Sequence, residues 1–305
     1  MRHAFEAVLV LLASVTASAQ SKTAECDFQN FRVPVPHVYD TTVNGINNNQ
    51  TIVGMYTLPK KYQGYWVTMG HGFMLSNGQY QQIDVPDRAQ TQPFALNDRN
   101  EVVGDSWPGY VGPPEGFLLD ASGYHTLSFP GYHDIFPYAI TNQDHIVGMM
   151  TSKENQTQGF LFANDRLQVI LFPGSEWSYA VGTNQAGDIV GNYSDGDDVF
   201  NGFLLRNGVF TRLDYPGAYE TFLWTINDQG VVIGSYQTTL QSDDIFFTWK
   251  DGEFEELPND GFYRCKGKMC PNPTFFLTLN DSGHFGGNFA VVRRGYAEGF
   301  IASCE

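Results

Sequence analysis

The chain has little charge, and basic residues are especially scarce. Only 16% of its 305 residues are charged, and 17 Lys and Arg against 33 Asp and Glu give a formal net charge of −16. Nucleic-acid backbones and anionic membrane surfaces are bound by clustered Lys and Arg, so neither is an expected partner. Disordered chains are rich in charge and poor in aromatic residues. Because 15% of the residues here are aromatic, we expect a folded protein.

Long apolar runs are absent, apart from a short one at the start of the chain. Residues 1–19 combine a basic start at Arg2, the apolar stretch Ala7–Ala13 and the small residues Ala17-Ser18-Ala19. This pattern is typical of a secretory signal peptide cleaved before Gln20. It is shorter than the ~20 apolar residues that span a bilayer. The sequence therefore predicts a secreted protein, extracellular or periplasmic, with no membrane insertion and one domain over 20–305.

Cysteines are few, and their number is even. Cys26 and Cys304 lie near the two ends of the predicted mature chain, whereas Cys265 and Cys270 lie close together. An even count in an oxidising compartment favours disulfide bonds over metal ligation. Four cysteines allow three pairings, so the choice among them depends on the architecture.

What the sequence does contain is a repeat. The pattern Gly/Ala/Thr-Ile/Leu-Asn, followed by Val-Val/Ile-Gly, recurs six times with substitutions. The closing glycines are spaced 50, 44, 43, 43 and 53 residues apart, at Gly54, Gly104, Gly148, Gly191, Gly234 and Gly287. Six units at this period fill the chain and leave no room for a second domain. The Asn-containing turns and the glycines are expected to be structural.

Each unit carries four short strand signals, here named A to D in chain order, and no sustained helical period. In the fourth unit they read Ser178–Thr183, Asp188–Tyr193, Gly202–Leu205 and Val209–Tyr215, separated by turn residues. Four strands repeated every ~40–50 residues are the signature of a β-propeller blade. The sequence therefore predicts an all-β fold, a six-bladed β-propeller with four-stranded antiparallel blades.

The ends of the chain predict how the ring closes. The sixth unit lacks a D strand, and Phe31–Pro36 matches the D-strand pattern of Gln81–Pro86. The N-terminal strand is therefore expected to complete the last blade, which removes exposed strand edges. This places Cys26 beside Cys304. We accordingly predict the disulfide bonds Cys26–Cys304 and Cys265–Cys270, the first locking the closure.

The repeated motifs resemble a known family. The Gly-Ile-Asn…Ile-Val-Gly pattern is followed by His71-Gly72-Phe73, and Pro-Gly ends the repeats. Together these residues resemble the extracellular HAF-type repeat family over nearly the whole mature chain. The resemblance implies secreted, β-propeller-like repeats and no general activity.

Aligning the units on their closing glycines predicts a rim around the central funnel. Fourteen positions before the glycine stand Asp40, Gln90, Asp134, Trp177, Glu220 and Pro273, and one position earlier stand Tyr39, Ala89, His133, Glu176, Tyr219 and Asn272. Strand A is innermost in a propeller, so these side chains should face the opening between the D–A and B–C loops. Polar groups among aromatic rings typify ligand sites. The predicted ligand-binding residues are Tyr39, Asp40, Tyr132, Trp177, Tyr219, Arg88 and Trp66. A solvated acidic loop is the alternative.

Two functions fit such a rim, and a third would not use it. The preferred one is binding of a small polar ligand or glycan, because rings stack on sugar C–H faces and carboxylates accept hydroxyl hydrogen bonds. The first alternative is an extracellular glycan hydrolase or lyase that uses His133, Asp134, Glu220 and Glu176 as acid and base. It has no G-x-S-x-G or H-E-x-x-H motif to support it, so enzyme activity stays open.

The second alternative is a protein-interaction scaffold. It would present the basic, aromatic flap Lys60–Trp66 and the loop Gly261–Pro273 to a protein partner. No cofactor is expected apart from a divalent cation such as calcium, held by Asp40, Asp134 and Glu220, because hard cations favour oxygen ligands.

Overall fold

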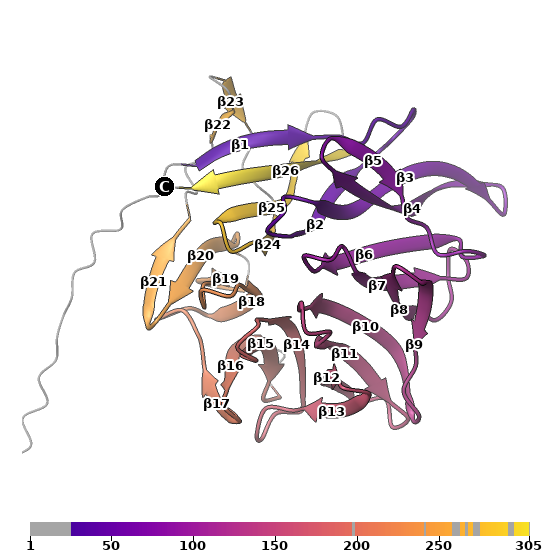
Figure 1. Ribbon diagram of the computed structural model, residues 1–305. Coiled ribbons are helices and arrows are strands. Elements are labelled where there is room, and N and C mark those ends of the chain that lie inside the picture. Colours follow the sequence, from indigo (N-terminus) through magenta and orange to yellow (C-terminus); the bar gives the residue numbers. More distant parts are fainter. Residues whose placement is uncertain are drawn as a thin grey trace, which may run out of the picture.

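The protein is a ring of four-stranded antiparallel sheets (Figure 1). The computed structural model describes residues 26–196, 199–240, 242–257, 263–265, 268–270, 275–291 and 296–304. Within them, six such sheets surround a central axis, each with its first strand innermost. The predicted six-bladed β-propeller is confirmed. The described residues contain no helix that is long and apolar enough to cross a bilayer.

The first three blades follow one another directly in the sequence. Blade one contains β2 (Thr41–Ile46), β3 (Ile52–Tyr62), β4 (Tyr65–Ser76) and β5 (Gln79–Gln82). Blade two contains β6 (Gln90–Leu96), β7 (Val102–Trp107), β8 (Glu115–Asp120) and β9 (Gly123–Leu127). Blade three contains β10 (Tyr132–Ile140), β11 (Ile146–Ser152), β12 (Thr157–Ala163) and β13 (Arg166–Ile170).

Blades four and five repeat this order, and blade six combines both ends of the chain. Blade four contains β14 (Trp177–Thr183), β15 (Ile189–Ser194), β16 (Asn201–Arg206) and β17 (Val209–Arg212). Blade five contains β18 (Glu220–Ile226), β19 (Val232–Gln237), β20 (Ile245–Lys250) and β21 (Glu253–Glu256). Blade six contains β24 (Phe275–Leu279), β25 (His284–Val291), β26 (Tyr296–Cys304) and β1 (Cys26–Phe31).

The repeated residues fill equivalent places in the packing. A Cβ atom on Gly54 would lie 1.9 Å from the carbonyl oxygen of Thr42, and one on Gly191 would lie 2.1 Å from that of Tyr179. Strand A therefore runs too close for any residue but glycine. Each third strand buries a phenylalanine at the same place, which follows x-Gly in five blades and Ile245-Phe246 in blade five: Phe73, Phe117, Phe160, Phe203, Phe247 and Phe300. These rings form the cores between sheets.

The N-terminal strand completes blade six as predicted, although earlier in the sequence than expected. β1 is Cys26–Phe31, and Asn30 lies opposite Phe300 just as Gln82 lies opposite Phe73. The predicted alignment of Phe31–Pro36 with Gln81–Pro86 was therefore wrong by two residues within the strand. Proline cannot donate to a strand ladder, so the segment around Pro34 and Pro36 follows the strand instead of forming it. Cys26 lies directly opposite Cys304.

The predicted flap is a hairpin rather than a loop. β3 and β4 stay paired out to Tyr62 and Tyr65, and Gln63 and Gly64 form the turn with φ values of 47° and 91°. Two successive positive φ values characterise a tight β-hairpin turn. At the tip, Tyr65 is 77% exposed and Trp66 is 74% exposed.

The inserted segment between blades five and six also differs from expectation. Its hairpin, β22 (Tyr263–Cys265) and β23 (Lys268–Cys270), has β22 against β1, the outermost strand of blade six (Figure 1). The described part of the insertion therefore lies at the outer edge of the ring, not over the funnel. The remaining residues of Gly261–Pro273 lie outside the described residues.

Candidate ligand-binding cavity

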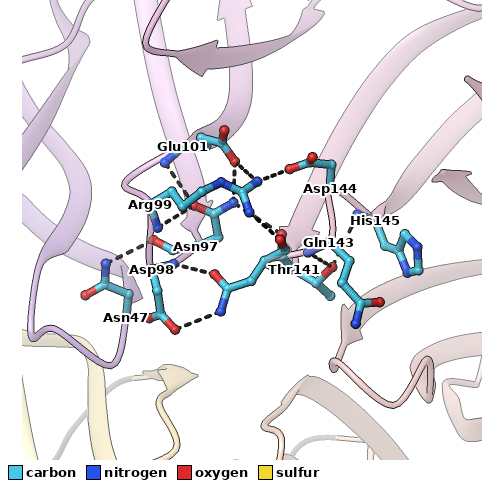
Figure 2. A network of polar contacts seen from close by, with 10 residues as sticks. Asn47, Asn97, Asp98, Arg99, Glu101, Thr141, Gln143, Asp144 and His145 are labelled. Atoms are coloured by element: carbon cyan, nitrogen blue, oxygen red, sulfur yellow. Dashed lines mark hydrogen bonds and ion pairs between the residues drawn. The ribbon is translucent and has the colours of Figure 1, made fainter. Parts of the chain in front are cut away.

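A belt of asparagines surrounds one end of the central channel. The Oδ1 atom of Asn47 accepts the backbone N–H groups of Asn49 and Thr51, which holds the turn between strands A and B. Its Nδ2 group donates to the carbonyl oxygen of Asn97 in the next blade, at 3.0 Å. Equivalent links to the next blade run from Asn97, Asn184, Asn227 and Asn280. Figure 2 shows this network around blades one to three. The repeated asparagine therefore joins blades.

A second polar layer lies on the axis beside the belt. It surrounds a narrow space of about 90 Å³ and includes Asn48, Asp98, Asn142, Gln185, Asp228 and Asp281. Burial raises the pKa of Asp98, but hydrogen bonds from Asn142 and Asn48 outweigh it and lower that pKa overall. Burial and the neighbouring Asp281 raise the pKa of Asp228. Most polar groups here form hydrogen bonds between neighbouring blades, so this end of the channel holds the blades together.

The belt is interrupted between blades three and four. Thr141 stands where the other blades have asparagine, and its Oγ1 still accepts the N–H groups of Gln143 and His145. Threonine has no amide to donate across the junction. In the second layer, Asn142 bonds back to Asp98 and Gln185 bonds forward to Asp228. Neither layer thus links blades three and four among the described residues.

A larger cavity of about 320 Å³ lies on the axis farther along strand A. Side chains alternate along a strand, so every second residue of the innermost strands faces the axis. All six residues ten positions before the closing glycines line this cavity: Asn44, Phe94, Tyr138, Val181, Trp224 and Leu277. Gln92, Tyr179 and Phe222, two residues earlier in their strands, line it as well. The cavity therefore lies between the asparagine belt and the predicted rim.

Aromatic rings from blades two to five form a continuous wall of this cavity. Ring centroids lie 5.1 Å apart for Phe94–Tyr138, 6.3 Å for Tyr138–Tyr179, 6.4 Å for Tyr179–Phe222 and 4.6 Å for Phe222–Trp224. Burial raises the pKa of Tyr138 and of Tyr179 well above the usual range, so both hydroxyls stay protonated. The wall offers flat apolar faces with two hydroxyl groups.

Polar groups stand on the side of blades one and two. Asn44 Nδ2 donates to the carbonyl oxygen of Pro93 at 2.7 Å. That bond fixes the amide and leaves its oxygen available. Gln92 has no side-chain hydrogen bond within the described part of the chain. The described lining residues include no carboxylate. The arrangement can stack a ring-shaped ligand and hydrogen-bond its edge, but it holds no acid–base pair.

One predicted rim residue belongs to this cavity wall. Trp177 stacks on Tyr179, with centroids 5.8 Å apart and planes 19° apart, and contacts the ring of Phe200 edge-on at 5.2 Å. Phe200, from the segment between β15 and β16, also lies 5.1 Å from Phe222. Trp177 therefore extends the aromatic wall from the cavity to the rim.

The rim acids do not converge on one point. Asp40 Oδ1 accepts the N–H of Ala297 at 2.6 Å and its Oδ2 accepts the hydroxyl of Thr57 at 3.1 Å, so Asp40 joins blades six and one. His133 Nδ1 lies 2.8 Å from Asp134 Oδ2 in a surface pair. No three potential metal-ligating side chains cluster anywhere in the described residues. Asp40, Asp134 and Glu220 are thus not brought together as a metal site.

The other predicted residues lie apart from the cavity lining. Tyr39 and Tyr219 are exposed, and Tyr132 packs at the edge of the blade-three core. Arg88 forms an ion pair with Glu115, and Glu176 is exposed near Gly196. Trp66 lies at the hairpin tip. Pro273 and Asn272 lie outside the described residues.

Sequence reasoning missed the inner layers, although the same alignment contains them. Twelve and ten positions before the closing glycines, blades two to five carry Tyr179, Phe222, Phe94, Tyr138 and Trp224. The signal is the two-residue period of strand A itself, since a residue that faces the axis at the rim has partners below it at every second position.

Comparisons with known proteins support the fold and show no activity for this chain. The chain matches no family model and no curated protein. TolB from Acinetobacter baumannii is similar in structure, with 13% identity and a TM-score of 0.51 over 77% of this chain and 60% of that one. Virginiamycin B lyase from Staphylococcus aureus follows with 12% identity and a TM-score of 0.46 over 92% and 99%. The β-propeller domain of the Trilobed protease from Pyrococcus furiosus has 9% identity and a TM-score of 0.49 over 88% and 97%.

Proposed function

We propose that the protein binds a small carbohydrate-type ligand in the central aromatic cavity. The observation that carries this proposal is the wall of Phe94, Tyr138, Tyr179, Phe222 and Trp224 facing the amides of Asn44 and Gln92. Aromatic faces accept the C–H faces of sugar rings, and amides bind the hydroxyl groups at their edge. A volume of about 320 Å³ falls at the lower end of the range of small-molecule sites and suits one or two sugar rings.

The test is a calorimetric titration with a panel of neutral and charged mono- and disaccharides. Removal of a stacking ring costs roughly 1–3 kcal/mol, which is about 5- to 150-fold in affinity. We therefore expect Tyr179→Ala to weaken binding by at least about fivefold. Tyr219→Ala, at the exposed rim, is the matched control and should bind as the unmodified protein does. Equal affinity in both variants would remove the cavity from the proposal.

Export and disulfide pairing belong to the same proposal. Directly opposed residues in an antiparallel pair have Cα atoms ~4.5–5.5 Å apart, within the range that a disulfide bridges. The register of Cys26 opposite Cys304 therefore supports that bond, and with it an oxidising compartment. The pairing of Cys265 with Cys270 is proposed from the sequence. The HAF-type resemblance points to the same extracellular setting.

A second candidate function is binding of a protein partner at the β3–β4 hairpin. Tyr65 and Trp66 are the most exposed large rings of the described chain, and Lys60 and Lys61 beside them are basic in an acidic protein. Exposed aromatic residues are enriched in protein–protein interfaces. Trp66→Ala should abolish capture of such a partner and leave the sugar titration unchanged.

A further inference from the structure

A buried carboxylate lies directly behind the cavity wall. Asp105, in β7 of blade two, is 1% exposed. Its Oδ2 atom accepts a hydrogen bond from the indole N–H of Trp107 at 3.0 Å. Its Oδ1 atom is buried and has no hydrogen-bond partner. An unpaired buried carboxylate oxygen is costly, and native proteins seldom keep one without a use.

The register of blade two places this carboxylate behind Gln92. Asp105 lies directly opposite Gln92 across β6 and β7, and opposed residues of an antiparallel pair point to the same face of the sheet. Gln92 lines the cavity, and Asp105 lies one strand farther from the axis on the same face of the sheet, directly behind the lining. Blade five shows the same relation, because Ser235, the residue after its closing glycine as Asp105 is in blade two, contacts the cavity residue Trp224 at 3.3 Å.

The lack of a hydrogen-bond partner for Asp105 Oδ1 has an identifiable cause. In blade four the equivalent residue, Asn192, accepts the N–H of Leu223 at 2.8 Å and donates to the carbonyl of Leu223 at 3.0 Å. The residue of blade three that corresponds to Leu223 is Pro137, since both lie opposite the closing glycine of their blades. Proline has no N–H to donate. The fold thus satisfies this position in blade four and leaves it unsatisfied in blade two.

The surroundings of Asp105 favour a positively charged donor. Its neighbour on the cavity wall is the ring of Tyr138, whose pKa is raised by burial and by the charge of Asp105. Burial raises the pKa of Asp105 itself to about 7. A protonated amine would neutralise the carboxylate, fill the vacant acceptor and lie against the electron-rich faces of the aromatic wall.

We propose that the ligand of the cavity carries a protonated amine, as an amino sugar does, and that Asp105 binds this amine through Oδ1. This inference rests on the proposed function for the location of the site and adds the chemical class of the ligand. The amine lies between Gln92 and Tyr138, with the sugar rings against Tyr179 and Trp224. Net negative charge on the whole chain increases the local concentration of such cations.

The experiment compares three disaccharides of the same shape at about pH 7, where Asp105 and the amine are both partly ionised. One carries free amines (glucosamine dimer), one carries acetylated amines, and one carries hydroxyls (cellobiose). A charge-assisted hydrogen bond contributes ~1.5–3 kcal/mol, so the free amine should bind about 10- to 100-fold more tightly than the hydroxyl form. Asp105→Asn should reduce that ratio to about one.

Two further variants separate a binding role from a folding defect. Pro137→Ala supplies the missing N–H to Oδ1, as Leu223 does for Asn192, and should also reduce the preference for the amine. Glu220→Gln, a rim carboxylate outside the cavity lining, should leave the preference intact. Melting curves confirm that each variant is folded.

The outcomes distinguish this inference from the proposed function. Equal binding of all three sugars by the unmodified protein overturns the role of Asp105 and leaves the carbohydrate site standing. Asp105-dependent binding of methylammonium with no binding of any sugar supports the cation and overturns the carbohydrate. A preference for the amine that survives Asp105→Asn overturns the inference as well.

Discussion

At the scale of single residues, Asp105 contributes to how stability depends on pH. Its carboxyl pKa is raised by burial to about 7, well above the ordinary value near 4. The unfolded chain therefore releases this proton at lower pH than the folded one. The stability of the unliganded protein should fall as pH rises from about 4 to about 7 and then level off, as far as this group is concerned.

Asp105→Asn should stabilise the unliganded protein by about 2–4 kcal/mol at pH 8 and much less at pH 5. The variant removes the buried charge, and its amide can donate to the carbonyl of Pro137 as Asn192 does to Leu223. Urea unfolding at the two pH values measures the gain. Asp134→Asn, on the surface, is the control without such a gain. A gain of equal size at both pH values would contradict the assignment of a raised pKa to Asp105.

The aromatic residues that line the cavity could have been predicted from the sequence, but the unpaired state of Asp105 could not. The repeat alignment contains the aromatic columns, so Tyr138, Tyr179 and Trp224 could have been predicted from the same reasoning that selected Trp177. The orphan state of Asp105 depends on Pro137 in the neighbouring blade. A contact between residues of different blades has no periodic signal within one strand.

At the scale of strands and turns, the repeat pattern predicted most elements closely. In blade four the observed β14, β15 and β16 agree with the predicted strands within a residue or two at each end, whereas β17 ends at Arg212 and not at Tyr215. The errors share one cause. Tyr215 and the residues after Phe31 belong to apolar segments that pack on the cores without ladder hydrogen bonds, and hydrophobic patterning does not separate packing from pairing.

The turn between strands A and B carries the contacts that tie blades together, and Thr141 leaves one junction without them. Thr141→Asn should add a hydrogen bond from the side-chain amide to blade four and raise the free energy of unfolding by about 0.5–1.5 kcal/mol. Thr141→Ser is the matched control, because it keeps the hydroxyl acceptor for Gln143 and His145 and adds no donor. Chemical denaturation of both variants measures the effect. Equal stability of the two would show that the belt adds nothing at this junction.

At the scale of the whole molecule, ring closure depends on β1, which joins residues from opposite ends of the sequence. If Cys26 and Cys304 are bonded as proposed, Cys26→Ser should lower stability by ~2–5 kcal/mol, because the bond closes nearly the whole chain. Cys265→Ser, which opens a loop of few residues, should lose less. Thermal unfolding and thiol titration measure both. An unchanged melting temperature in Cys26→Ser, with no free thiol at Cys304, would refute the pairing.

The ring also determines where a ligand can bind, since the asparagine belt narrows one end of the channel and the aromatic wall lines the larger cavity next to it. The most direct test of this account is a crystal structure of the protein with a glucosamine disaccharide. The account predicts sugar rings stacked on Tyr179 and Trp224 and an amine nitrogen within hydrogen-bond distance of Asp105 Oδ1. A sugar bound instead at the exposed rim or at Trp66, with the cavity empty, would contradict it.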